Sequence, residues 1–226
     1  MTASRKPRAK RKPAADNDAS LKAAVLEAAL PHVPLDGFTD KVLAEAAAEA
    51  GINKISLARL FPDGPLSLVE AFSDNIDAEM EKRLAKLKLA QMKIRDRIKT
   101  AVETRLELLK PNKDAARRAA AFLTLPPHAA MGAKLLYRTV DTIWRAIGDT
   151  STDFNFYTKR AILAAVYSST LMRWFTDDSE DETATREFLA HRIDNVMQFE
   201  KLKAGIRERT KGLPSFADIL RGGKRA

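Results

Sequence analysis

The sequence predicts an all-α protein, and three observations carry that prediction. Glycine is scarce, with 9 in 226 residues, and Ala, Leu, Lys, Arg and Glu dominate, a composition that favours helices. Apolar residues recur near the 3.6-residue period over long stretches, whereas no stretch alternates with the two-residue period of a strand. The chain is 45% hydrophobic and 31% charged, which is normal for a globular protein with a sizeable core.

Three short helices are expected near the N-terminus because glycine or proline follows each one and capping residues precede the first two. Ser20 is a suitable N-cap for the first helix, and Thr39 or Asp40 for the second. The three expected helices are Ser20–Leu30, Thr39–Ala50 and Lys54–Phe61.

The next stretch, Leu66–Leu109, keeps a helical period almost throughout. More than 40 residues is long for one helix of a globular protein. We therefore expect a break near Ala90–Arg95, although neither glycine nor proline marks it. The remaining expected helices are Lys113–Leu123, Ala129–Ile147, Asn155–Phe175 and Glu182–Lys201.

The formal net charge of +9 is unevenly distributed. Met1–Lys12 carries six basic residues and no acid, and residues 201–226 carry a net +6, which leaves about −3 for residues 13–200. Basic tails attract nucleic acid and anionic lipid alike. We expect residues 1–19 to be a basic disordered tail, without the apolar segment of a signal peptide.

The helix expected over Asn155–Phe175 is apolar nearly all round, unlike an ordinary surface helix with one apolar stripe. Such a helix must bury both faces, or bury one and offer the other to a partner. One side carries Phe156, Leu163, Tyr167 and Trp174, interrupted by Arg160, and the other carries Tyr157, Ala161, Ala164, Met172 and Phe175.

Catalytic chemistry finds no support in the residue pattern. The three histidines are scattered, cysteine is absent, and there is neither a zinc-binding pattern nor a glycine-rich phosphate loop. No apolar run approaches the roughly 20 residues of a membrane-spanning helix. We expect a protein that is not an enzyme and holds neither a cofactor nor a metal.

Residues 42–54 have the form of a helix, a glycine turn at Gly51 and the start of a second helix. Together with Leu57–Pro62, they resemble the N-terminal domain of TetR-family repressors. Residues 36–70, however, hold three basic residues against six acids, whereas a DNA reader must neutralise phosphates. We expect a vestigial helix-turn-helix region over residues 20–70 and no nucleic acid, with a TetR-like DNA-binding regulator as the alternative.

The C-terminal stretch, residues 202–226, is expected to be a basic tail with a short amphipathic helix. Apolar residues flanked by lysines and arginines are typical of an interfacial membrane anchor; docking of the tail on its own domain is the other interpretation. The expected membrane residues are Lys211, Leu213, Phe216, Ile219, Leu220 and Arg221.

Residues 153–161 read DFNFYTKRA, and 140–144 read VDTIW with Gly148-Asp149 following. With Leu30–Pro34 and Phe61–Pro65, these blocks resemble the COQ9 family of ubiquinone-biosynthesis proteins over about residues 20–200. Phe156 stands where many members have Trp, and the lack of a transit pattern suggests a bacterial homologue.

The COQ9 resemblance implies a dimeric TetR-like helical bundle whose C-terminal domain, residues 71–201, binds isoprenoid quinone intermediates. It further implies that the protein presents them to a COQ7-like hydroxylase, in the cytoplasm at the inner membrane, or on the matrix side in a eukaryote. The implied partner-binding residues are Asp141, Trp144, Phe156, Tyr157, Arg160 and Leu163. The implied lipid-binding residues are Leu123, Met131, Leu135, Val140, Val166, Tyr167 and Met197.

Overall fold

The computed structural model describes residues 14–152 and 154–210, and every regular element among them is helical. The all-α fold class predicted from the sequence is therefore confirmed. The N-terminal helices are α1 (Ala14–Ala29), α2 (Val33–Asp36), α3 (Asp40–Glu49), α4 (Lys54–Leu60) and α5 (Pro65–Leu84). They are followed by α6 (Ile94–Leu109), α7 (Lys113–Thr124), α8 (Ala129–Ala146), α9 (Phe154–Phe175) and α10 (Thr183–Thr210). Short 3-10 turns lie at Leu89–Gln91, Lys110–Asn112, Pro126–His128 and Glu180–Glu182.

Helix boundaries differ from the sequence prediction in four places. α1 begins at Ala14, so the expected start at Ser20 is wrong, and residues 14–19 are helical rather than part of a disordered tail. The long predicted helix is broken between Leu84 and Ile94, slightly earlier than expected. The predicted loop before α3 contains the single-turn helix α2, in which Pro34 occupies a first-turn position that proline tolerates. α10 continues to Thr210, so the predicted end at Lys201 is wrong, and residues 202–210 continue that helix instead of beginning a separate tail.

The chain divides into two compact units, the first ending at Tyr167 and the second beginning at Ser168. α9 therefore starts in the first unit and ends in the second. The predicted boundary between residues 70 and 71 falls inside α5 and does not coincide with this division.

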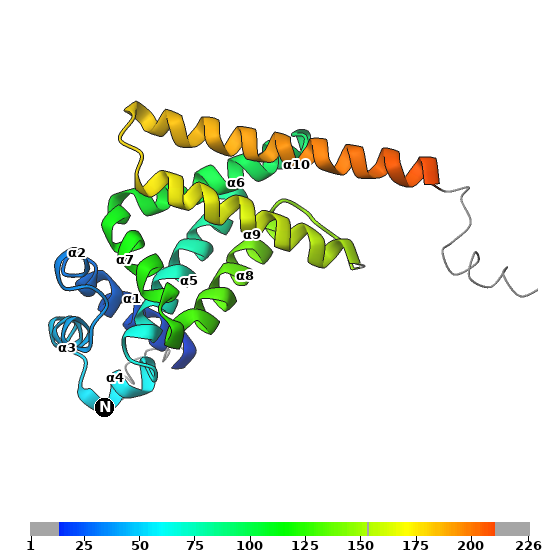
Figure 1. Ribbon diagram of the computed structural model, residues 1–226. Helices are drawn as coiled ribbons and strands as arrows, with labels where there is room; N and C mark the ends of the chain where they lie inside the picture. The colour runs from blue at the N-terminus through cyan, green and yellow to red at the C-terminus, as the bar shows by residue number, and fades with distance from the viewer. Residues whose placement is uncertain (1–13, 153, 211–226) are drawn as a thin grey trace, which may run out of the picture. The chain divides into compact units, whose positions relative to one another are not determined.

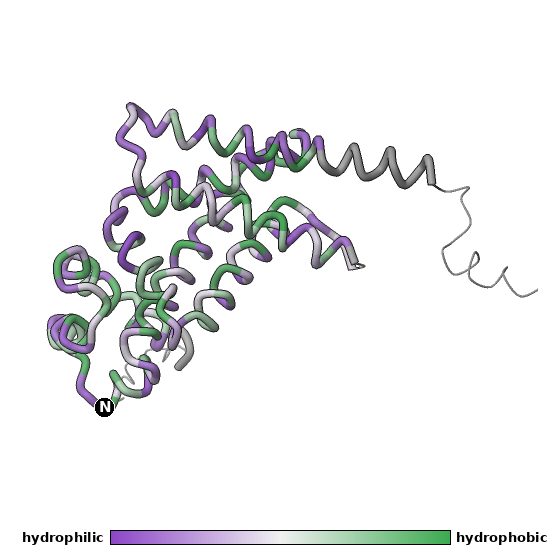
Figure 2. Tube along the Cα trace, in the orientation of Figure 1, coloured by the Kyte–Doolittle hydropathy of each residue, from purple (hydrophilic) through white to green (hydrophobic). Residues whose placement is uncertain are grey.

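The first unit is organised around α5, which contacts α1, α6 and α8 (Figure 1). Hydrophilic and hydrophobic residues are interleaved along its helices (Figure 2), as expected for helices that bury one side. α5 buries Leu68, Phe72, Ile76, Met80 and Leu84, which are spaced four residues apart. This stripe is the central element of the core of the unit.

A buried polar cluster joins four helices of the first unit. Arg105 on α6 donates to Asp77 Oδ1 on α5 at 2.8 Å, to Ser73 and Thr139, and to the hydroxyl of Tyr167. Thr139 on α8 in turn donates to Asp77 Oδ2 at 2.8 Å. Because a buried charge is costly unless it is paired and hydrogen-bonded, this cluster fixes how α5, α6, α8 and the middle of α9 pack together.

Candidate functional site

The start of α9 is joined to α8 by ion pairs around Arg160. Its side chain is 4% exposed, and Nε and Nη2 each lie 2.7 Å from Asp141 Oδ1 on α8. Nη1 lies 3.4 Å from Asp149 Oδ2, in the loop that follows α8. Arg160 is thus a buried cation of α9, and the two carboxylates that it faces belong to α8 and to the loop after α8.

Lys159, the preceding residue, completes this network. Its Nζ donates to Asp149 Oδ1 at 2.8 Å and to Ser151 Oγ at 2.6 Å, while Ser151 Oγ donates to Asp149 Oδ1 at 2.8 Å. Burial raises the pKa of Asp149, but the hydrogen bonds from Lys159 and Ser151 outweigh it, so this pKa lies below its ordinary value. Asp149 is therefore ionised at neutral pH and holds two consecutive cations of α9.

Trp144 and Leu163 belong to the packed interior beneath this network. Trp144 is 6% exposed and Leu163 is 2% exposed. The indole Nε1 of Trp144 donates to the backbone carbonyl of Lys159 at 3.2 Å, and the Lys159 ammonium lies 5.3 Å from the centre of the indole ring. The Trp144 side chain of α8 therefore supports the first turns of α9.

The aromatic side chains at the start of α9 form the outer edge of the site. The guanidinium carbon of Arg160 lies 3.4 Å from the centre of the Phe156 ring, and Nη1 donates to the Phe156 carbonyl at 3.1 Å. Tyr157 meets Phe156 edge to face, with ring centres 5.1 Å apart. Tyr157 is 66% exposed, so a large aromatic ring projects from a firmly held helix.

The six residues predicted for partner binding thus lie together, but they differ in exposure. Tyr157 is exposed, Phe156 and Asp141 are half-buried, and the other three are buried. The sequence analysis missed Asp149, Ser151 and Lys159. The signal was present: two adjacent cations in an apolar helix need anions, and Asp149 lies shortly after the predicted helix Ala129–Ile147.

The seven residues predicted for lipid binding are all buried or half-buried. Leu135, Val140, Val166 and Tyr167 are buried, whereas Leu123, Met131 and Met197 are half-buried. Tyr167 has its hydroxyl held by Arg105 in the polar cluster. Burial raises the pKa of this phenol, and the neighbouring arginine opposes the rise only in part.

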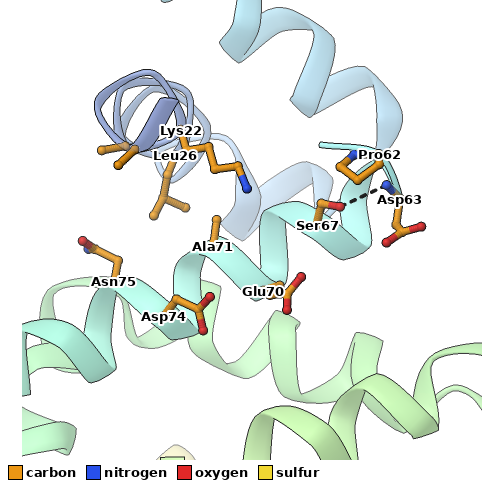
Figure 3. Close-up of a pocket in the computed structure, with 11 residues that line it drawn as sticks. Lys22, Leu26, Pro62, Asp63, Ser67, Glu70, Ala71, Asp74 and Asn75 are labelled. Carbon is orange, nitrogen blue, oxygen red and sulfur yellow. Dashed lines mark hydrogen bonds between the residues drawn. The ribbon is translucent and has the colours of Figure 1, made fainter. Parts of the chain in front are cut away.

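A groove of about 330 Å³ lies between α1 and α5, remote in sequence from those seven residues (Figure 3). Lys22 of α1 faces it from one side, and Glu70 and Asp74 of α5 lie on the other. Both carboxylates are paired with cations of α8: Glu70 with Lys134 and Arg138, and Asp74 with Arg138. None of the seven predicted lipid-binding residues lines this groove.

The helix-turn-helix region has the predicted form: α3 and α4 flank Gly51, whose φ of +68° suits glycine. Asn53 caps α4 by accepting from the Ser56 amide at 2.9 Å. Arg59, one of the three basic residues in residues 36–70, forms an ion pair with Asp18 of α1 and donates to both carboxylate oxygens. Ile55, at the start of α4, is 85% exposed.

Within residues 14–152 and 154–210, no group of three or more His, Cys, Asp or Glu side chains could hold a metal ion. In the same residues, no helix is long and apolar enough to cross a membrane. The six predicted membrane residues, from Lys211 to Arg221, lie outside the described residues.

The fold is TetR-like. The crystal structure of a TetR transcriptional regulator from Nitrosomonas europaea matches this chain with a TM-score of 0.61 and 18% sequence identity, covering 77% of this chain and 97% of the regulator. At that identity the match shows the fold alone.

The COQ9 family model matches residues 129–200, which include α8 and the network at the start of α9. The ubiquinone biosynthesis protein COQ9, mitochondrial, of Bos taurus is 36% identical over 189 residues, and that of Homo sapiens is 35% identical over 188 residues, each match covering 80% of this chain. The chain belongs to the COQ9 family, as its sequence predicts. It spans 59% of the length of these two relatives.

Proposed function

We propose that this chain is a non-catalytic protein of ubiquinone biosynthesis that binds isoprenoid quinone intermediates and presents them to a COQ7-like hydroxylase. Its relatives are named ubiquinone biosynthesis proteins, and their family model covers the site at the start of α9. The observation that carries the proposal is the exposed Tyr157 ring on a helix pinned by buried ion pairs. Exposed aromatic anchors on rigid elements are typical of protein interfaces.

The lipid part of the proposal draws on the apolar surface that α8 and α9 share. Leu135, Val140 and Val166 are buried aliphatic side chains of these helices, and they offer the kind of surface that an isoprenoid chain contacts. Tyr167 takes a supporting role, because its hydroxyl is engaged by Arg105. We further propose that the protein acts as a homodimer, peripherally associated with the membrane and without nucleic acid.

Two measurements test this function. Mass spectrometry of lipid extracted from the purified, folded protein is expected to detect an isoprenoid quinone or a precursor of one; repeated absence would contradict the lipid part. Binding to a COQ7-like hydroxylase is expected to weaken at least tenfold on Tyr157→Ala, since buried aromatic anchors contribute about 2 kcal/mol or more.

The matched control for Tyr157→Ala is Tyr137→Ala. Tyr137 lies on α8 and is 46% exposed, so it tests the removal of a surface phenol outside the site. Equal losses from the two variants, or no loss from Tyr157→Ala, would rule out the aromatic edge as the docking point.

A further inference from the structure

The connection between α5 and α6 concentrates positive charge. Residues 82–99 contain eight lysines and arginines and one acid, a net +7. Because residues 13–200 together carry about −3, everything in that span outside this segment carries about −10. Residues 82–99 are therefore a basic segment within an otherwise acidic part of the chain. They are distinct from the basic stretches at the two ends of the chain.

Large apolar side chains are exposed within the same segment. Leu87 is 43% exposed, Met92 37% and Ile94 42%. They lie within eight consecutive residues, and every residue from 85 to 96 except Leu89 is exposed. We call residues 85–96 the α5–α6 tip.

The tip has a fixed backbone. Leu84 and Leu89 are buried and anchor it to the first unit. The guanidinium of Arg97 donates to the carbonyls of Ala90 and Met92, both at 3.0 Å, and to that of Ile147 at the end of α8 at 3.1 Å. Because these hydrogen bonds fix the backbone of the turn, they also keep the three apolar side chains pointing outward.

The lysines at the base of the tip and those within it differ in their acidic partners. Lys82 and Lys99, at its base, pair with Glu79 and Glu103. Among the ion pairs formed between described residues, none involves Lys86, Lys88 or Lys93.

We propose that the α5–α6 tip docks on an anionic lipid surface, with Leu87, Met92 and Ile94 entering the headgroup region and the surrounding lysines binding lipid phosphates. Lysines that alternate with aliphatic side chains are the composition of an interfacial membrane contact. Single-stranded nucleic acid binders place aromatic rings among the cations for base stacking, whereas the exposed side chains here are aliphatic. The proposal that the tip docks on lipid depends neither on the proposed quinone function nor on the predicted C-terminal anchor.

The test uses the full chain, which contains no cysteine. A single cysteine replacing Leu87 is labelled with an environment-sensitive fluorophore, and the protein is mixed with vesicles of phosphatidylcholine alone or with added phosphatidylglycerol. The emission is expected to shift to the blue and rise only with the anionic vesicles. A label on Ile55→Cys, which lies on α4 and is more exposed than Leu87, serves as the control and is expected to stay unchanged.

Sedimentation with the same vesicles measures the charge contribution. Replacing Lys86, Lys88 and Lys93 by Gln is expected to lower the partition on the order of 100-fold at low ionic strength, since each basic residue contributes about a fivefold factor. All three side chains are exposed, so the variant should fold, and circular dichroism verifies this.

A chain carrying Phe216→Ser, Ile219→Ser and Leu220→Ser separates the tip from the predicted C-terminal anchor. The label at position 87 should still respond to anionic vesicles in this background. An unchanged emission at position 87 in the otherwise unaltered chain, or an unchanged partition of the lysine variant, would overturn the proposal. An equal change in the emission at position 87 with duplex DNA and with anionic vesicles would also overturn the proposal.

Discussion

Asp149 lies at the junction of α8 and α9, and its removal provides a quantitative test of the network that holds the aromatic edge. Its side chain is 4% exposed and faces Lys159, Arg160 and Ser151. In Asp149→Ala, Arg160 keeps both contacts to Asp141, whereas Lys159 loses its carboxylate partner. The variant therefore removes one of the two carboxylate partners of the buried Arg160. It also leaves the partly exposed Lys159 without its carboxylate partner.

The expected loss in the free energy of unfolding is about 2–3 kcal/mol. Removing one member of a buried pair costs about 3–5 kcal/mol, but Lys159 is 38% exposed and can turn toward water, which reduces the cost. Asp149→Asn should lose less, because its amide oxygen still accepts one hydrogen bond. Urea denaturation measures both variants, and Asp114→Ala, which removes an exposed carboxylate paired with Arg117, is the control.

The pH dependence of the same effect has a definite sign. The pKa of Asp149 in the folded protein lies below its ordinary value, so the carboxylate stabilises the fold above the pKa of the unfolded chain, and this contribution is lost as pH falls through the folded pKa. The difference between the original protein and Asp149→Ala should therefore shrink in acid. A loss as small as that of Asp114→Ala at neutral pH, or a difference that grows in acid, would refute the reasoning.

Two further predictions concern the buried polar groups of each unit. Tyr167→Phe should destabilise the fold by about 1–3 kcal/mol in thermal unfolding, because Arg105 loses an acceptor in the interior. Burial raises the pKa of Tyr167, so the stability it contributes should be present below its unfolded pKa and disappear as pH rises through the folded value; unfolding at alkaline pH with and without the hydroxyl verifies this. In the second unit, Asp177 accepts from Ser179 and from the amide and hydroxyl of Thr185 at the start of α10. Burial opposes ionisation, yet these hydrogen bonds hold the pKa of Asp177 well below its usual range, so Asp177→Ala should cost about 1–2 kcal/mol at neutral pH and progressively less in acid, as measured by denaturant unfolding; an equal cost at all pH values would contradict this.

Much of the helical order was predictable because glycine, proline and capping residues mark most ends. Thr39 and Asn53 cap α3 and α4 through their side chains, and Gly148, with φ of +89°, follows the end of α8. The start of α1 was missed because Ser20 is a typical N-cap residue. The alanines before it are strong helix formers, however, and they extend the helix toward the N-terminus. Local signals compete at that point, and only the folded chain selects between them.

The site was predictable as a set of residues but not as an arrangement. A helix that is apolar on all sides gives no periodic signal for which residues face outward. The exposure of Tyr157 and the burial of Arg160 therefore depend on Asp141 and Asp149, which come from another helix and a loop. A buried arginine becomes intelligible only when the carboxylates that face it have been located.

Arg97 links the proposed membrane contact to the proposed docking site. One guanidinium binds the carbonyls of Ala90 and Met92 in the α5–α6 tip and the carbonyl of Ile147, two residues before Asp149. The tip and the α8–α9 loop therefore lie at the same end of the first unit. A protein that passes a membrane-soluble quinone intermediate to an enzyme needs its lipid contact and its enzyme contact close together. An arrangement with the tip at the lipid surface meets that need, because it keeps the loop that positions Tyr157 next to the membrane in which such a substrate is dissolved.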